Sequence, residues 1–167
     1  MTSIPRETIR KVLVGEAAIL HELTGRSALY WGYEPEFLEW EPEAIAVTPD
    51  FLAKATVYAL EDEDRILGYY ALTGEPSDLY LDKLFVEPDR IGTGCGKRLW
   101  RHAVATARDL GARELLIAAD PNAASFYRAM GAVWEREATT TRHGWNLQFL
   151  RYPLSGTDSD NDIRILS

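Results

Sequence analysis

One segment restricts the fold of this chain more than any other, because a strand, a glycine-rich loop, an amphipathic helix and a second strand follow one another there. The strand formers of "SDLYLDKLFV" (77–86) precede glycines, and apolar residues then recur at helical spacing over 94–110. Gly111 is a natural end for that helix. The continuous apolar run "ELLIAA" (114–119) is typical of a buried strand in a parallel pair. The segment therefore predicts a β–α–β crossover.

The rest of the chain predicts further elements on both sides of this crossover. Apolar residues at helical spacing predict a first helix over 9–23, with Thr8 as its cap and Gly25 at its end. The other expected elements are a helix between residues 35 and 46, a hairpin of strands 55–60 and 65–74, a short helix 123–130, and closing strands 132–141 and 145–154. This order predicts an α/β fold, a mixed sheet with helices on both faces.

Composition and charge narrow the class of protein. With 167 residues the chain is long enough for one domain with a sizeable core, and no apolar run approaches the roughly 18 residues of a membrane helix. The formal net charge of −8 disfavours a nucleic-acid partner; it could attract a cationic substrate or serve solubility alone. The N-terminus shows no secretory signal, so we expect a cytoplasmic protein. The three histidines and single cysteine lack metal-ligand spacing, so we expect no metal.

The glycine loop "RIGTGCGK" (90–97) stands where a helix begins. Helix N-termini present free N–H groups and partial positive charge, and glycine lets the backbone approach an anion closely. The loop is not a P-loop, which would need glycine at Ile91 and Ser or Thr at Arg98. It is not a dinucleotide fingerprint either, which would need glycine at Lys97 or Leu99. We expect it to bind a phosphate group; the alternative is a simple turn.

Two separated stretches of the chain resemble one known family. The stretch "LFVEPDRIGTGCGKRLW" (84–100) is similar to the acyl-CoA-binding motif of the GNAT superfamily of N-acetyltransferases. The stretch "DPNAASFYRAMGAVWE" (120–135) resembles the family's later motif, an Asn near the start of a short helix followed by Phe-Tyr and Gly. The resemblance implies a GNAT-like fold, with a mostly antiparallel central sheet and a splayed pair of parallel strands. It implies a single acetyltransferase domain over residues 1–154, followed by a tail, 155–167.

The resemblance also implies which residues bind acetyl-CoA, the expected cosubstrate. Gly94 and Gly96 match the motif glycines, whereas Gly92 is additional slack, and Ile91 stands where the family has Arg or Gln. Arg90 lies one residue too early for that position. The implied cofactor-binding residues are Leu84, Phe85, Val86, Ile91, Gly92, Gly94, Cys95, Gly96, Lys97, Asn122 and Phe126.

In such a family the acceptor amine attacks the thioester directly, without an acyl-enzyme. Tyr127 is the implied general acid, because a phenol can protonate a thiolate of comparable basicity. Asp82 is a candidate general base near the expected reaction centre; it could equally be an exposed or salt-bridged carboxylate.

The stretch "ALYWGYEPEF" (28–37) corresponds to the region that flanks the acceptor site in this family. Aromatic faces with carboxylates suit an ammonium group, so we expect Tyr30, Trp31, Tyr33 and Glu34 to bind the substrate. The alternative is that the aromatic side chains cover the core and the acids are solvated. The expected acceptor is a small-molecule amine or a peptide amine.

Other functions stay open at this level. The main alternative is a non-catalytic acyl-CoA-binding sensor on the same fold. A third possibility is a nucleotide-phosphate enzyme, which is disfavoured because the glycine loop fits neither the P-loop nor the dinucleotide-binding motif. A nucleophilic role for Cys95 is conceivable, but a small side chain inside the phosphate cradle is the preferred reading. The apolar "IRIL" (163–166) could pack on the body of the chain or on a second copy, so a homodimer is left open.

Overall fold

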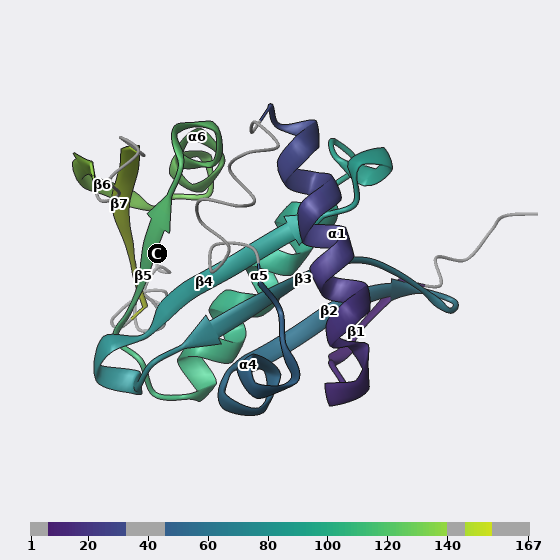
Figure 1. The fold of residues 1–167 in the computed structure, drawn as a ribbon. Coiled ribbons are helices and arrows are strands. Elements are labelled where there is room, and N and C mark those ends of the chain that lie inside the picture. The colour runs from purple at the N-terminus through teal and green to yellow at the C-terminus, as the bar shows by residue number, and fades with distance from the viewer. Residues whose placement is uncertain (1–6, 33–45, 140–145, 155–167) are drawn as a thin grey trace, which may run out of the picture. The chain divides into compact units, whose positions relative to one another are not determined.

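The computed structural model describes residues 7–32, 46–139 and 146–154 (Figure 1). Within these ranges the strands are hydrogen-bonded in the order β1-β2-β3-β4-β5-β7-β6, and the pairing of β4 with β5 is parallel. The mixed α/β class with a mostly antiparallel sheet is thereby confirmed. The elements are β1 (Glu7–Lys11), η1 (Val14–Glu16), α1 (Ala17–Tyr30), α4 (Pro49–Lys54), β2 (Thr56–Asp62), β3 (Arg65–Thr73), η2 (Pro76–Asp78), β4 (Tyr80–Val86), η3 (Pro88–Arg90), α5 (Cys95–Asp109), β5 (Glu114–Ala119), α6 (Pro121–Ala129), β6 (Val133–Thr139) and β7 (Asn146–Pro153).

The predicted first helix over 9–23 is wrong at both ends: only its residues 17–23 are α-helical, and Thr8, the expected cap, lies in β1. Its first residues form β1, which pairs antiparallel with β2 from Glu7 opposite Asp62 to Lys11 opposite Tyr58. Helix α1 begins only at Ala17 and runs past Gly25, which lies in its middle and does not end it. The free edge of β2 provides hydrogen bonds that the local apolar spacing could not reveal, so tertiary pairing overrides the helical pattern.

The other sequence-based elements that fall within the described residues agree with the structure within a few residues. The predicted strand 77–86 begins later, at Tyr80, because Pro76–Asp78 form the short 3-10 helix η2. Strand β5 is parallel to β4 as expected, although it is antiparallel to β7 on its other side. Only one face of β5 is buried, since Leu115 and Ile117 are buried but Ala118, on the other face, is exposed. The helix expected between residues 35 and 46 lies almost entirely outside the described residues.

The chain divides into two compact units, and the first comprises Met1–Ala71 and Lys83–Trp100. In this unit α1 lies across β2 and β3 (Figure 1). Its buried side chains, with those of α4 and the strands, form one hydrophobic cluster: Ala17, Leu20, Leu23, Val47, Leu52, Val57, Ala59, Ile66, Tyr69 and Ala71. The Thr24 hydroxyl lies 2.6 Å from that of Tyr69 and joins α1 to β3 inside this cluster.

The opposite face of β3 is where the start of α5 packs. Successive side chains of a strand point to opposite faces, so Gly68 faces away from the α1 cluster that contains Tyr69. A Cβ atom at Gly68 would lie 2.8 Å from the Phe85 carbonyl oxygen and 2.9 Å from Leu99 of α5. Glycine is therefore required here, because β4 and α5 approach the β3 backbone too closely for any side chain.

The second unit comprises Leu72–Asp82 and Arg101–Ser167. Here β5 pairs with the N-terminal end of β4 through Tyr80 opposite Leu116 and Leu81 opposite Ile117. Strand β7 lies between β5 and β6, and α6 contacts both β5 and β7. None of the helices in the described part of the chain is long and apolar enough to cross a membrane.

Candidate functional site

The loop between β4 and α5 needs glycine at two positions. Gly92 has a φ of 85° and Gly94 a φ of 94°, which is the left-handed region that other residues rarely adopt. Gly96 lies inside the first turn of α5. The sequence-based view that Gly92 is only additional slack is therefore wrong, since the turn requires it as much as Gly94.

The first turn of α5 presents backbone donors. The helical hydrogen bonds begin with the Arg98 N–H donating to the Gly94 carbonyl, at 3.1 Å. The amides of Cys95, Gly96 and Lys97 precede that bond, so they have no acceptor within the helix, and the helix dipole adds positive potential beside them. Among the described residues, a Cβ at Gly94 would meet nothing within 4 Å, so the space beside this glycine is open to them. A phosphate group fits this arrangement.

Most charged side chains of this loop are already paired within the first unit. The pairs are Glu87 with Arg26 of α1, Asp89 with Arg65 of β3, Arg90 with Asp62 of β2, and Arg98 with Glu7 of β1. Lys97 is exposed and, among the described residues, is in no ion pair. Lys97 is thus the loop cation whose charge is available to an anion.

Cys95 is buried at the start of α5. Its Sγ atom lies 3.4 Å from the Thr93 hydroxyl and 3.8 Å from the Arg98 guanidinium. The residue is 1% exposed, which agrees with a small packed side chain.

The strand β4 carries several of the expected residues. Side chains alternate along it, so that Asp82 is exposed while Lys83 is buried. Leu84 and Phe85 are half-buried and Val86 is buried. The Lys83 ammonium lies 5.1 Å from the centre of the Phe51 ring, a cation–π contact that the sequence did not suggest.

Helix α6 positions the residues of the second motif. Asp120 caps it, accepting hydrogen bonds from the N–H groups of Asn122 (2.7 Å) and Ala123 (3.1 Å). Asn122 itself is exposed, and the Phe126 and Tyr127 rings meet edge to face with centroids 5.2 Å apart. Burial, and to a smaller extent the charge of Asp120, raise the pKa of Tyr127 above its usual value. Its hydroxyl therefore stays protonated at neutral pH.

Two of the four expected acceptor residues are described. Tyr30 and Trp31, at the end of α1, are 55% and 47% exposed and pack edge to face with ring centres 5.3 Å apart. Tyr33 and Glu34 lie outside the described residues. Within the described ranges no three His, Cys, Asp or Glu side chains are grouped so that they could hold a metal ion.

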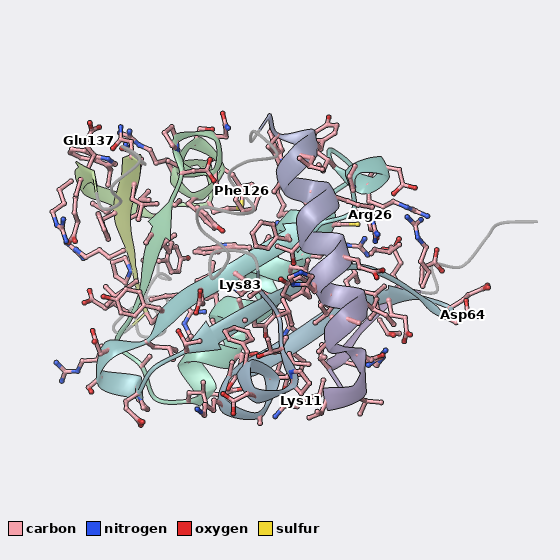
Figure 2. All side chains as sticks on the ribbon, in the orientation of Figure 1. Lys11, Arg26, Asp64, Lys83, Phe126 and Glu137 are labelled. Carbon is pink, nitrogen blue, oxygen red and sulfur yellow. The ribbon has the colours of Figure 1, made fainter. Side chains whose placement is uncertain are left out.

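Sequence reasoning missed the contact between Arg26 and Glu87. The Arg26 guanidinium donates to both carboxylate oxygens of Glu87, at 3.1 and 2.5 Å, and Figure 2 shows Arg26 extending from α1. The two residues are 61 positions apart, and no local pattern connects them. The one available signal is the Glu-Pro pair, because a residue before proline is held extended at the end of a strand.

These features define a class of α/β protein in which a sheet strand is followed by a glycine loop and a helix N-terminus whose backbone amides could hold an anion. The model of the acetyltransferase (GNAT) family matches residues 26–132, and the chain belongs to this family. The family resemblance inferred from the two motifs is confirmed.

Individual proteins resemble the chain over different lengths. The peptidyl-lysine N-acetyltransferase YjaB of Salmonella typhimurium is 34% identical over 93 residues, which are 55% of this chain and 60% of the relative's length. A GCN5-related N-acetyltransferase structure from Rhodopseudomonas palustris superposes with a TM-score of 0.72 at 25% identity, covering 92% of this chain and 98% of that one. An N-acetyltransferase structure from Thermoplasma acidophilum in complex with coenzyme A has a TM-score of 0.70 at 18% identity, covering 88% and 98%.

Proposed function

We propose that the protein transfers an acetyl group from acetyl-CoA to a primary amine. The observation that carries this proposal is the N-terminus of α5 in a chain of the GNAT family: its first amides have no acceptor within the helix, and left-handed glycines precede them. Acetyl-CoA supplies an activated thioester. Transfer forms an amide C–N bond and breaks the C–S bond, so one proton must leave the amine and one must reach the sulfur.

The residues around the loop would hold the nucleotide end of acetyl-CoA. In this proposal the amides of Cys95, Gly96 and Lys97 donate to the pyrophosphate, and the Lys97 ammonium neutralises part of its charge. Ile91, where the family has Arg or Gln, contributes no charge, and its backbone N–H already donates to the Pro88 carbonyl at 3.4 Å. The backbone of Leu84, Phe85 and Val86 hydrogen-bonds the pantetheine arm.

Tyr127 is the proposed general acid. The raised pKa of the phenol keeps its proton in place until charge develops on the leaving sulfur, to which it then donates. Asn122 and Phe126, on the same helix, contact the cofactor arm.

The acceptor amine must lose a proton, and Asp82 is the proposed base, acting directly or through a water molecule. Tyr30 and Trp31 present exposed aromatic surface to a cationic amine, with Tyr33 and Glu34 beside them in sequence. Because the curated relative is a peptidyl-lysine acetyltransferase, a lysine side chain of a peptide is the first acceptor to test. We further propose that residues 1–154 act as one catalytic domain in the cytoplasm.

The test is a thiol-release assay with acetyl-CoA against lysine peptides, polyamines and amino acids. We expect release with at least one amine class, and a Tyr127→Phe variant with about 100-fold lower kcat at unchanged acetyl-CoA affinity. Phenylalanine keeps the buried ring, so folding is preserved. Tight CoA binding without thiol release from any amine would instead indicate the non-catalytic sensor, and unchanged kcat in Tyr127→Phe would exclude the general-acid role.

A further inference from the structure

Glu87 is held in place by three separate interactions at the point where β4 ends. Its backbone N–H donates to the Leu67 carbonyl of β3 at 2.8 Å. Its own carbonyl accepts from the Arg90 N–H at 2.9 Å and so closes the turn η3. Its carboxylate accepts two hydrogen bonds from Arg26, and the Glu87 side chain is only 9% exposed. A buried carboxylate with a bidentate guanidinium partner has one favourable position.

A chain of short contacts connects Glu87 to the start of α5. The Arg90 carbonyl accepts from the N–H of Thr93 at 3.3 Å and from its hydroxyl at 2.6 Å. The next residue, Gly94, accepts the first helical hydrogen bond of α5 from Arg98. Each turn begins where the previous one ends, so these contacts link Glu87 to the first turn of α5, where the three donor amides lie.

We propose that the Arg26–Glu87 pair is a positioning device for the pyrophosphate loop, which fixes the α5 amides in their binding geometry before acetyl-CoA arrives. The inference rests on the proposed function, because it assumes that this loop binds the pyrophosphate. Arg26 and Glu87 do not touch the cofactor in this view. They lower the cost of binding, since a loop that is already ordered loses less conformational entropy when the ligand binds.

The same loop contains a second arginine–carboxylate pair for comparison. Arg65 donates to both oxygens of Asp89, at 3.1 and 3.2 Å, but from the single nitrogen Nη2, whereas Arg26 donates to Glu87 from two nitrogens, Nε and Nη2. The two pairs differ in burial as well, because the Asp89 side chain is 62% exposed and that of Glu87 is 9% exposed. Exposed pairs are screened by water and contribute little, whereas a buried carboxylate without its partner must move or be solvated.

The experiment compares the Glu87→Gln variant with Asp89→Asn by calorimetric titration of coenzyme A and of pantetheine, which lacks the pyrophosphate. We expect Glu87→Gln to raise the Kd of coenzyme A about tenfold and Asp89→Asn to raise it less than about twofold. Pantetheine binding should be the same in all proteins, because the pantetheine arm meets β4 and not the loop. Hydrogen exchange of the Arg90 and Thr93 amides should accelerate in Glu87→Gln, while amides in β3 keep their protection.

A second variant keeps the proposal testable if Glu87→Gln does not fold. Arg26→Lys keeps the positive charge but loses the two-pronged geometry, and Arg26 is half exposed, so the protein should fold. We expect an intermediate rise in the Kd of coenzyme A. The inference is overturned if folded Glu87→Gln and Arg26→Lys bind coenzyme A with the Kd of the parent protein. It is also overturned if their affinities for coenzyme A and for pantetheine fall by the same factor. Failure of the proposed function looks different, because the parent protein itself would then bind no coenzyme A, or would bind it without releasing thiol from any amine.

Discussion

Replacing Gly68 with alanine should destabilise the protein at the point where β3, β4 and α5 meet. The new Cβ would lie 2.8 Å from the Phe85 carbonyl oxygen, 2.9 Å from Leu99 and 3.3 Å from the Val86 Cα. Two of these atoms belong to the backbone of β4, which cannot rotate away as a side chain can. The clash must therefore be relieved by a shift of β4, of α5, or of both.

The size of the effect follows from these contacts. Adding one methyl group to a closely packed interior costs about 1–3 kcal/mol, and backbone contacts place this site toward the upper end of that range. Because Phe85 and Val86 also belong to the proposed pantetheine-binding backbone, acetyl-CoA affinity should fall together with stability.

The assay is urea denaturation of Gly68→Ala beside Gly25→Ala, followed by coenzyme A titration of both. A Cβ at Gly25, in the middle of α1, would meet nothing within 4 Å. Alanine there should stabilise the protein by about 0.5–1 kcal/mol through helix propensity. If Gly68→Ala is as stable as the parent and binds coenzyme A equally well, the close approach of β3 to β4 and α5 is refuted.

Three further predictions concern other parts of the chain. Gly94→Ala should lower the free energy of unfolding by about 1–2 kcal/mol, because its backbone is left-handed, and should weaken coenzyme A binding. Gly111→Ala, at the end of α5, has an equally left-handed backbone and should lower the free energy of unfolding by the same amount without changing coenzyme A affinity. Calorimetric titration of coenzyme A distinguishes the two variants. Thr24→Val keeps the side-chain shape but removes the hydroxyl beside a buried tyrosine, and should lower the free energy of unfolding by about 1–3 kcal/mol in urea titration. The Arg10 guanidinium donates hydrogen bonds to both carboxylate oxygens of Glu16, at 3.0 and 2.7 Å, and lowers the pKa of that carboxyl. The stabilisation is therefore complete above the unfolded value of 4.5 and is lost as the pH falls through the folded pKa. Thermal unfolding at successive pH values should therefore show that the melting temperature of Glu16→Gln falls less steeply below pH 4.5 than that of the parent protein. Equal slopes in the two proteins would contradict this.

Several features of the fold could be predicted because their signals are local. Helix α5 shows its apolar stripe within its own residues, and Gly111 ends it with a φ of 91°. The glycine loop is predictable in the same way, since a left-handed turn selects glycine directly. The N-terminal segment was misread as a helix because the hydrogen bonds that make Glu7–Lys11 a strand come from β2, about 50 residues further along the chain.

The sequence by itself determined the family, the glycine loop and the amphipathic helix that follows it, because each depends on spacing within a short stretch of chain. It also singled out Tyr127 as a candidate acid. Only the tertiary structure decided that Glu87 is buried against Arg26, that Gly68 must have no side chain, and that Lys83 lies beside the Phe51 ring. These features arise where residues distant in sequence meet, and the burial that sets their energies exists only once the chain has folded.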